Sequence, residues 1–389
     1  MKVIFASNYL NHHQLSFSIE MIKETEGQFI FIATEEISEE RVALGYTDMN
    51  SKYPWVIKAY QSKEEKERAI EQINQADVVI MGSAPEYLIE QRLRQNKLVF
   101  RYSERIFKNK GNAIKNFLRR IKYCFFNKNI KRCYMLCASA YAAMDYSKLS
   151  LYVGKTYKWG YFPELKHYND INSLIENKKN NSILWVGRFI EWKHPEVGLE
   201  VARRLKEDGY CFNLSFIGCG ELEETLKKKV KEENLENFIT FLGSMSTEQV
   251  RAYMEESEIF LFTSDRNEGW GAVLNEAMNS ACAVVASHSI GSVPFLIQDY
   301  ENGLIFKDGQ ADDLYKKVKF LLDNPTLRKK ISMNAYETIY KQWNASNAAK
   351  RLILLSKEIL SGNKKAEPFK DSVCSKAEKL RDNWYKQKS

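Results

Sequence analysis

The sequence predicts two α/β domains in succession, each built on a parallel, doubly wound sheet. Short apolar runs alternate with segments whose apolar residues recur at helical spacing, from the first residues to beyond residue 300. A parallel sheet with helices on both faces produces this alternation. With 389 residues, the chain also suits two domains better than one. We therefore expect two Rossmann-like domains.

The first domain is predicted over residues 1–162. Helical patterns over 14–23 and 63–74 separate its early strands. The predicted strands are 3–6, 29–33, 77–81, 97–102 and 134–138. A polar stretch over 161–181 follows them and marks the linker between domains.

The second domain is predicted over 163–343 and has a more regular pattern. Its predicted strands are 183–186, 214–217, 239–242, 259–262, 283–286 and 303–306. Its predicted helices are 195–207, 221–233, 247–255, 313–322 and 327–343, with a further helix over 345–360. Parallel sheets of this kind bind ligands beyond the carboxyl ends of their strands.

The stretch 264–281 leads from a buried strand through a glycine-bearing loop into a helix. Its helix start offers unpaired backbone N–H groups and the positive end of the helix dipole, which suit a phosphate group. Glu268 lies in the loop, and Glu276 lies in the helix among apolar neighbours. A carboxylate there needs hydrogen-bond donors, which sugar hydroxyls supply. Alternatively, both carboxylates only complement the helix dipole.

The run from Glu268 through Gly269, Trp270 and Gly271 to Glu276 resembles the Glu-x7-Glu motif of retaining family 4 glycosyltransferases. These enzymes have the GT-B fold, in which two Rossmann-like domains face a central cleft. The resemblance implies that Glu268 contacts the donor sugar, that Glu276 contacts the nucleotide ribose, and that the helix start stabilises the diphosphate. It also implies that the C-terminal helices, about 344–389, pack back on the first domain.

Two cations follow the first strand of the second domain. Gly187 permits a tight backbone, and Arg188 and Lys193 are expected near the strand's carboxyl end, where they would neutralise a diphosphate leaving group. The segment resembles the family's Gly-Arg…Lys motif, although the family usually has glycine where this chain has His194. The alternative is that both are ordinary surface cations.

Two further turns of the second domain resemble the family. Gly218 lies in a Gly-x-Gly turn that opens a helix, and Leu242 lies in a loop similar to the one beside the nucleotide base. We expect backbone contacts with the donor there. A Gly-x-Gly turn alone is a weak signal, because any tight strand–helix turn can require glycine.

The first domain matches the family less well. The loop over 7–14 lacks the glycines found in many members, and it carries His12 and His13 where an acceptor would approach. Capping or solvated histidines are an equal alternative. Members often place a histidine after the fourth strand, where this chain has Glu104. We expect Glu104 to position the acceptor, while the residue that activates the acceptor stays open.

Charge and cysteine usage indicate the setting. The formal charge is +8, yet 105–132 alone holds ten Lys or Arg and no Asp or Glu, so the remainder carries −2. Interleaved aromatic residues suggest a helix lying on an anionic membrane surface. A nucleic-acid patch lacks a supporting motif, and a partly buried helix with a solvated basic side is the other alternative. Seven scattered cysteines without a Cys-x-x-Cys pair favour a reduced, cytoplasmic protein.

The resemblance therefore implies a retaining, metal-independent glycosyltransferase that needs no cofactor. It would move a sugar from a nucleotide diphosphate sugar to a glycan or lipid-linked acceptor during bacterial surface-polysaccharide assembly. No apolar run is long enough to span a bilayer, so we expect a peripheral position at the inner face of the plasma membrane and no nucleic-acid partner. The alternatives are a GT-B-fold sugar-nucleotide epimerase and a non-catalytic, membrane-associated binding subunit.

Overall fold

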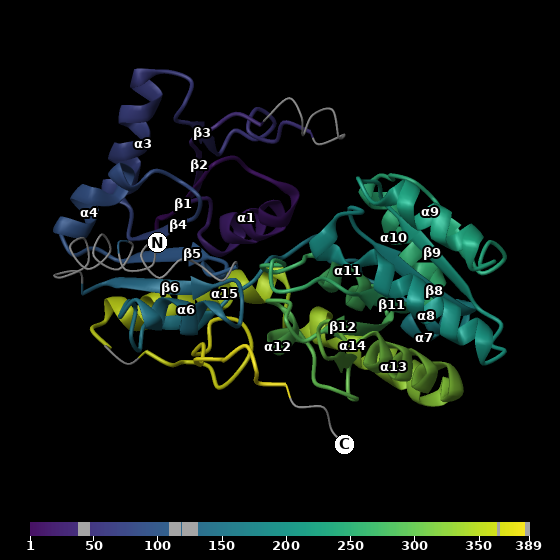
Figure 1. Cartoon of the computed structure of the whole chain (residues 1–389). Helices are drawn as coiled ribbons and strands as arrows, with labels where there is room; N and C mark the ends of the chain where they lie inside the picture. The colour runs from purple at the N-terminus through teal and green to yellow at the C-terminus, as the bar shows by residue number, and fades with distance from the viewer. Residues whose placement is uncertain (38–46, 109–117, 119–130, 364–365, 386–389) are drawn as a thin grey trace. The chain divides into compact units, whose positions relative to one another are not determined.

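The structure is a computed structural model that describes residues 1–37, 47–108, 118, 131–363 and 366–385. The chain divides into two compact units, which Figure 1 shows with the chain coloured from end to end. The first unit comprises Met1–Glu164 and Asn344–Arg381. The second comprises Leu165–Trp343 and the chain from Asp382 onward. Each unit holds one parallel sheet, so the predicted α/β architecture is confirmed.

The sheet of the first unit has seven parallel strands in the order β3-β2-β1-β4-β5-β6-β7. They are β1 Val3–Ser7, β2 Phe29–Ala33, β3 Val56–Lys58, β4 Val78–Met81, β5 Val99–Ser103, β6 Cys133–Cys137 and β7 Thr156–Lys158. The strand order reverses between β1 and β4. The two edge strands β3 and β7 were not predicted. They read Val-Ile-Lys and Thr-Tyr-Lys, so neither is a wholly apolar run.

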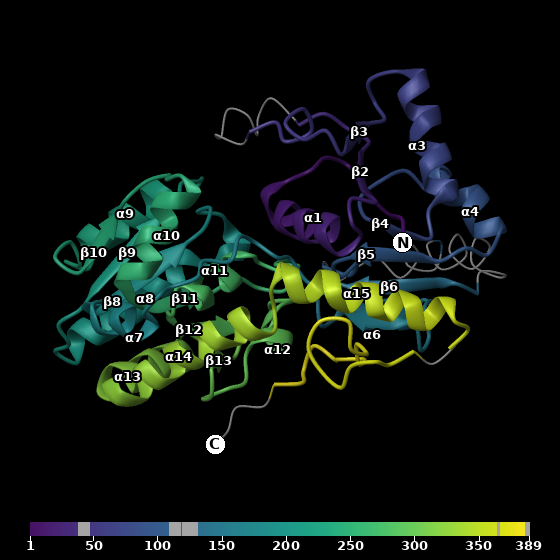
Figure 2. The same ribbon diagram turned by 180° about the vertical axis from the view of Figure 1, so that it is seen from behind.

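Helices cover this sheet. They are α1 His12–Glu24, α3 Lys63–Gln75, α4 Glu90–Arg94, α6 Ala142–Lys148 and α15 Ala345–Leu360. α15 packs against α1 although more than 300 residues separate them in the chain, and Figure 2 shows α15 from behind. After α15 the chain runs beside edge strand β7, where the N–H of Cys374 donates to the carbonyl of Lys158 at 2.8 Å. This pairing covers the exposed edge of the sheet.

The sheet of the second unit has six parallel strands in the order β10-β9-β8-β11-β12-β13. They are β8 Lys179–Val186, β9 Asn213–Ile217, β10 Ile239–Phe241, β11 Ser257–Phe262, β12 Ala283–Ser287 and β13 Leu304–Phe306. All six were predicted. The order reverses between β8 and β11, and these two neighbours carry the loops discussed below.

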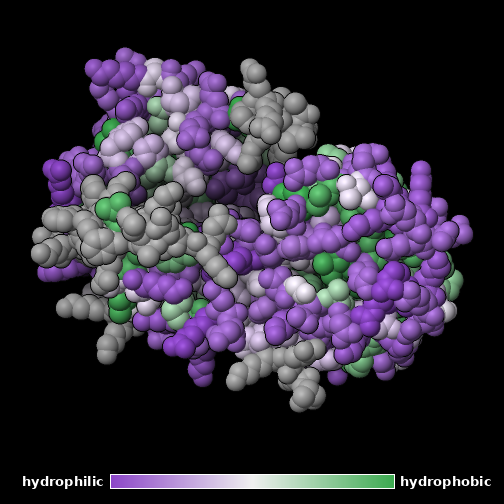
Figure 3. Space-filling view, in the orientation of Figure 1, coloured by the Kyte–Doolittle hydropathy of each residue, from purple (hydrophilic) through white to green (hydrophobic). Residues whose placement is uncertain are grey.

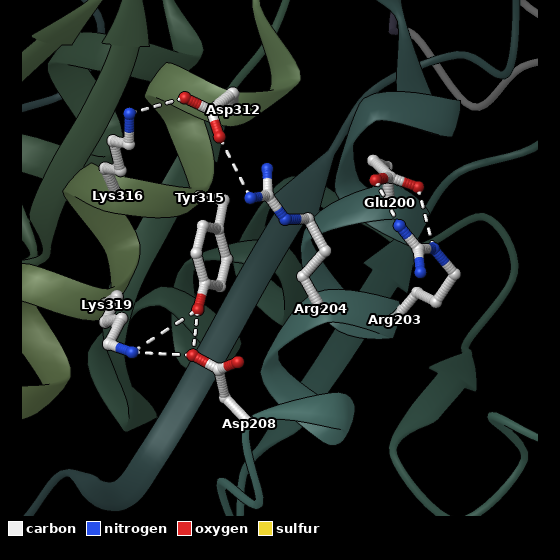
Figure 4. A network of polar contacts seen from close by, with 8 residues as sticks. All are labelled: Glu200, Arg203, Arg204, Asp208, Asp312, Tyr315, Lys316 and Lys319. Carbon is white, nitrogen blue, oxygen red and sulfur yellow. Dashed lines mark hydrogen bonds and ion pairs between the residues drawn. The ribbon is translucent and has the colours of Figure 1, made fainter.

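Eight helices of the second unit fall in the described residues. They are α7 Ile171–Glu176, α8 Pro195–Glu207, α9 Glu223–Glu232, α10 Thr247–Glu256, α11 Val273–Asn279, α12 Val293–Leu296, α13 Ala311–Asp323 and α14 Pro325–Lys341. A polar network joins α8 to α13 (Figure 4), with Arg204 2.9 Å from Asp312 and Lys319 2.6 Å from Asp208. Exposed ion pairs of this kind stabilise a fold by about 0–1 kcal/mol each.

The end of the chain differs from the sequence-based allocation, which assigned all of 344–389 to the first domain. From Asp382 onward the chain belongs to the second unit. The reason is an aromatic anchor: the hydroxyl of Tyr385 donates to the carbonyl of Ile305 at 2.6 Å, and its ring centre lies 5.7 Å from that of His288.

The surface is mainly hydrophilic on the face shown in Figure 3, where hydrophobic residues form small separate areas. Within the described ranges, no helix combines the length and the apolar character needed to cross a membrane. Most of the basic segment 105–132 lies outside the described residues, so the predicted membrane helix there stays a prediction.

Candidate functional site

The loops that follow β8 and β11 are joined to each other at the point where the strand order of the second sheet reverses. The backbone N–H of Asp265 donates to the carbonyl of Trp192 at 3.0 Å. The hydroxyl of Thr263 donates to the carbonyl of Lys193 at 2.7 Å. Open α/β sheets bind ligands at such a reversal, beyond the carboxyl ends of the strands. The candidate site of this unit therefore lies at the β8–β11 junction.

Lys193 and Glu268 form an ion pair across this junction, with their side chains only 13% and 11% exposed. The hydroxyl of Ser264 donates to the same carboxylate oxygen at 3.1 Å. The Lys193 ammonium also lies 4.6 Å from the centre of the Trp192 ring. The structure thus brings two of the three predicted catalytic residues into direct contact. An anionic ligand at this point would compete with Glu268 for the lysine.

Arg188, the third predicted catalytic residue, is exposed on the same loop as Lys193. Its guanidinium carbon lies 6.0 Å from the centre of the Trp192 ring. Among the described residues its guanidinium has no hydrogen-bond or ion-pair partner. Since all its N–H donors remain open, Arg188 is available to a diphosphate.

Two predicted site glycines are required by close contacts. Gly218 has φ +135°, and a Cβ built there would lie 1.9 Å from the carbonyl oxygen of Gly187. Gly271 has φ +78°, and a Cβ there would lie 2.3 Å from the Phe262 ring. Both contacts allow the loops to pack without side chains between them. The backbone N–H of Leu242 donates to Phe216 at 2.9 Å, so that N–H is not open to a ligand.

Glu276 lies within α11, and its carboxylate is only partly exposed. In the part of the chain that the structure describes, this carboxylate has no hydrogen-bond or ion-pair partner. Burial raises its pKa to about 7, and the positive charge of Arg251 opposes that rise. A carboxylate that lacks partners in a largely desolvated place is suited to a ligand that donates hydrogen bonds.

The structure corrects the prediction that Trp270 contacts a substrate. Its side chain is fully buried, and its ring centre lies 5.9 Å from that of Trp343. Its indole N–H donates to the amide oxygen of Asn275 at 2.9 Å. The indole is therefore part of the core beneath the loop. The neighbouring Gly269 is also buried. Sequence position in the motif does not reveal this inward direction.

The predicted acceptor residues of the first unit lie beyond strands β1 and β5. His12 and His13 begin α1, and the side chain of Asn11 caps this helix by accepting from the N–H of His13 at 3.1 Å. The two imidazole centres are 3.7 Å apart. Neither histidine is the capping group, so the capping alternative for their side chains does not apply.

Tyr161 links His13 to Glu104, and the sequence analysis did not identify it. Its ring stacks on that of His13 with centres 5.6 Å apart, and its hydroxyl donates to Glu104 at 2.5 Å. The second carboxylate oxygen of Glu104 accepts from Lys108 at 2.7 Å. Burial raises the pKa of Tyr161, which keeps its hydroxyl a donor. Tyr161 follows a three-residue strand that was not predicted, and no motif in the sequence marks it as a site residue.

Within the described ranges, no group of three or more His, Cys, Asp or Glu side chains is arranged to hold a metal ion.

Comparison with known protein structures shows the fold. A glycosyltransferase from Rickettsia africae has a TM-score of 0.67 at 18% identity, covering 93% of this chain and 99% of that one. Anabaena Alr3699/HepE, solved in complex with UDP, has a TM-score of 0.66 at 15% identity, with 93% and 100% covered. The protein has the GT-B fold, as predicted.

Sequence comparison adds a family for part of the chain: residues 168–338 match the model of Glycosyl transferases group 1. The amylovoran biosynthesis glycosyltransferase AmsK of Erwinia amylovora is 35% identical over 137 residues, which are 34% of this chain and 33% of that protein. A Campylobacter jejuni N-acetylgalactosaminyltransferase, whose name specifies a diphospho-undecaprenol acceptor, is 32% identical over 151 residues, covering 39% and 40%. The chain spans less than half the length of these curated relatives.

Proposed function

We propose that the protein is a retaining glycosyltransferase that moves a sugar from a nucleotide diphosphate sugar to an acceptor hydroxyl. The observation that carries this proposal is the Lys193–Glu268 ion pair at the β8–β11 reversal, inside the segment that matches Glycosyl transferases group 1. Glu276, which has no partner among the described residues, adds a second ligand-seeking carboxylate in the same segment.

The donor would bind by an exchange of partners. Its diphosphate would bind to the ammonium of Lys193, to the guanidinium of Arg188 and to backbone N–H groups near Gly271. Glu268, released from the lysine, would then accept hydrogen bonds from the donor sugar. Glu276 would accept from the ribose hydroxyls. For Lys193 and Glu268, this exchange would keep each charge paired both before and after binding, which avoids the cost of an isolated buried ion. Glu276 would gain its partner only on binding.

In the proposed reaction, the bond from the sugar's anomeric carbon to the diphosphate breaks, and a bond from that carbon to the acceptor oxygen forms on the same face. The acceptor hydroxyl proton passes to the departing diphosphate oxygen. Lys193 and Arg188 would stabilise the charge that develops on that group, which is the largest electrostatic demand of the step. We assign no protein nucleophile and no metal to it.

We propose that the acceptor binds to the first unit near Glu104 and His13, with a lipid-linked or growing cell-surface glycan as its class. Support comes from the names of the relatives, which include amylovoran biosynthesis and a diphospho-undecaprenol acceptor.

Segment 105–132 would hold the protein reversibly at an anionic membrane. Wild-type protein should sediment with anionic but not neutral vesicles at low salt, and loss of sedimentation in high salt is expected. No binding to anionic vesicles at low salt would contradict this attachment.

A panel of nucleotide sugars tests the main proposal. Thermal shift should identify a donor, since a ligand at a hundred times its dissociation constant stabilises the fold by about 2.7 kcal/mol. The same donor, with an undecaprenyl-diphosphate-sugar acceptor, should release nucleoside diphosphate and yield an extended glycan in the presence of a chelator. Isomerised sugar without an acceptor would instead support the epimerase alternative. Donor binding with no product under any condition would support the binding-subunit alternative.

A further inference from the structure

His194 occupies a special backbone position between the two loops of the candidate site. Its φ and ψ are both 50°, the left-handed conformation, and it stands directly between Lys193 and the first residue of α8. Its side chain makes no capping hydrogen bond to that helix. The imidazole is instead directed to carboxylates, so the residue has a role other than capping.

The two ring nitrogens face carboxylates from different elements. Nδ1 lies 2.8 Å from an oxygen of Glu196 on α8. Nε2 lies 3.7 Å from an oxygen of Asp265, in the loop after β11. The carbonyl of Asp265 accepts from the backbone N–H of Glu268 at 3.1 Å. One imidazole therefore touches both the element that follows Lys193 and the loop that holds Glu268.

We propose that His194 is a positioning residue that, when protonated, fastens the Lys193 loop to the Glu268 loop by bridging Glu196 and Asp265. This inference rests on the proposed function, because the two loops matter for catalysis only if that function is right. The bridge itself can be tested without a substrate. Both ring nitrogens are donors only in the protonated form, so the neutral ring can serve just one of the two carboxylates as a donor.

The surrounding charges support protonation. Glu196 on α8, Asp265 after β11 and Asp308 after β13 all face the ring and are negative. The hydrogen bond that the imidazole donates to Glu196 is the largest cause that raises the pKa of His194 above 6.5, while partial burial opposes it. The adjacent cation, Lys193, is already paired with Glu268. The bridge is therefore complete below pH 6.5 and is lost as pH rises through the elevated pKa.

The consequence for the site is a dependence of donor affinity on pH. While the bridge holds, the loop bearing Glu268 is fixed against the loop bearing Lys193, so less ordering is needed when a diphosphate binds. A partly exposed pair of this type contributes about 0.2–1 kcal/mol, which corresponds to an affinity change of about 1.5- to 5-fold.

The test compares His194→Asn and His194→Gly with the wild type. Asparagine and glycine both tolerate a left-handed backbone, so neither should unfold the loop. His167→Asn is the matched control, because His167 is an exposed histidine of the same unit whose ring lies against Tyr340, at 5.4 Å. Dissociation constants for UDP are measured by calorimetry at pH 6 and pH 8.5. The dissociation constant of each variant is divided by that of the wild type at the same pH, so that the ionisation of UDP itself cancels.

We expect His194→Asn to weaken UDP binding about threefold at pH 6 and to leave it unchanged at pH 8.5. His167→Asn should leave the ratio at one at both values. A ratio for His194→Asn that is the same at both pH values would overturn the proposal, since a purely structural effect does not follow the protonation of the ring.

NMR titration of the imidazoles separates this proposal from the proposed function. The His194 resonance, assigned by its loss in His194→Asn, should titrate above pH 6.5, and Glu196→Gln should lower that midpoint. If UDP fails to bind the wild type while this shift is present, the assumed donor is wrong and the bridge stands. If His194 titrates at or below 6.5 and Glu196→Gln does not move it, the bridge is disproved whatever UDP does.

Discussion

Both units carry a polar cluster beyond the carboxyl ends of sheet strands, but they build it differently. In the second unit the cluster rests on backbone contacts, with Gly218 against the carbonyl of Gly187 and the ion pair of Lys193 and Glu268 above. In the first unit, Tyr161 connects Glu104 to His13 through a hydroxyl and a ring face. Both clusters are formed by side chains, but only the loops of the second unit also require glycine at fixed positions.

This difference explains why only one cluster has a readable motif. Where backbones pass in close contact, glycine is the sole residue that fits, so its spacing is fixed in the sequence. A hydroxyl that meets a carboxylate can come from many positions and several residue types. We therefore expect substitutions in the second unit to have the larger effects.

The largest expected effect is on stability and concerns Gly218→Ala. The added Cβ would lie 1.9 Å from the Gly187 oxygen, so the loops after β8 and β9 must separate. We expect a loss of about 3 kcal/mol or more in unfolding free energy, from backbone strain and the clash together. Gly209→Ala is the control: it has φ +78° and open space around it, so only about 1 kcal/mol is expected. Equal losses in urea unfolding would contradict the close-contact account.

Lys193→Ala should lower turnover by about a hundredfold, because it removes a cation from the developing charge of the leaving group. The same change leaves Glu268 without its ion-pair partner, so the double variant Lys193→Ala with Glu268→Gln should recover stability but not activity. Steady-state kinetics on the donor found by the nucleotide-sugar panel provides the measurement. The control Arg203→Ala removes a surface cation of the α8 network and should leave turnover unchanged. Wild-type turnover in Lys193→Ala would exclude the leaving-group role.

Sequence reasoning was most successful where a pattern extends over many residues. All six strands of the second sheet were predicted, because each is a buried apolar run followed by a helical pattern. The edge strands β3 and β7 were missed because each ends in a lysine and is not wholly apolar, whereas the equally short β13 reads Leu-Ile-Phe. Trp270 was assigned to the site by its place in a motif, yet packing against Trp343 turns it into the core. Tyr161 and the bridge at His194 depend on contacts between distant segments, which a single sequence does not display.

Glu276→Gln should stabilise the fold and weaken the binding of nucleoside diphosphate. Burial raises the pKa of this carboxyl from 4.5 to about 7, so its ionisation costs free energy in the folded state. The wild type therefore loses stability as pH rises from 4.5 through 7, and the glutamine variant does not. We expect the variant's advantage to grow by about 2–3 kcal/mol between pH 4 and pH 8. Urea unfolding at both pH values measures it.

The same variant should bind nucleoside diphosphate about tenfold more weakly at pH 8, because a hydrogen bond to a charged acceptor contributes about 1.5–3 kcal/mol. If the variant is more stable but binds nucleoside diphosphate as tightly as the wild type, Glu276 does not contact the nucleotide. Glu268→Gln is the comparison within the motif: it should leave nucleoside diphosphate affinity closer to wild type, since Glu268 is assigned to the sugar.

The smallest expected effect is in the first unit, where Tyr161→Phe removes one hydroxyl and keeps the ring on His13. Glu104 retains Lys108 as a partner, so its carboxylate is not left unpaired. One hydrogen bond of this kind contributes about 0.5–1.5 kcal/mol, so we expect the KM for the acceptor to rise about two- to tenfold. Donor affinity should not change.

Tyr157→Phe removes an equivalent hydroxyl bond, to the carbonyl of Ala366 at 2.7 Å, and should leave the acceptor KM at its wild-type value. If both variants behave alike, the Tyr161 cluster is only structural, and the acceptor must be sought elsewhere on the first unit. If Tyr161→Phe instead matched the loss in Lys193→Ala, the two clusters would not differ in the way their construction implies.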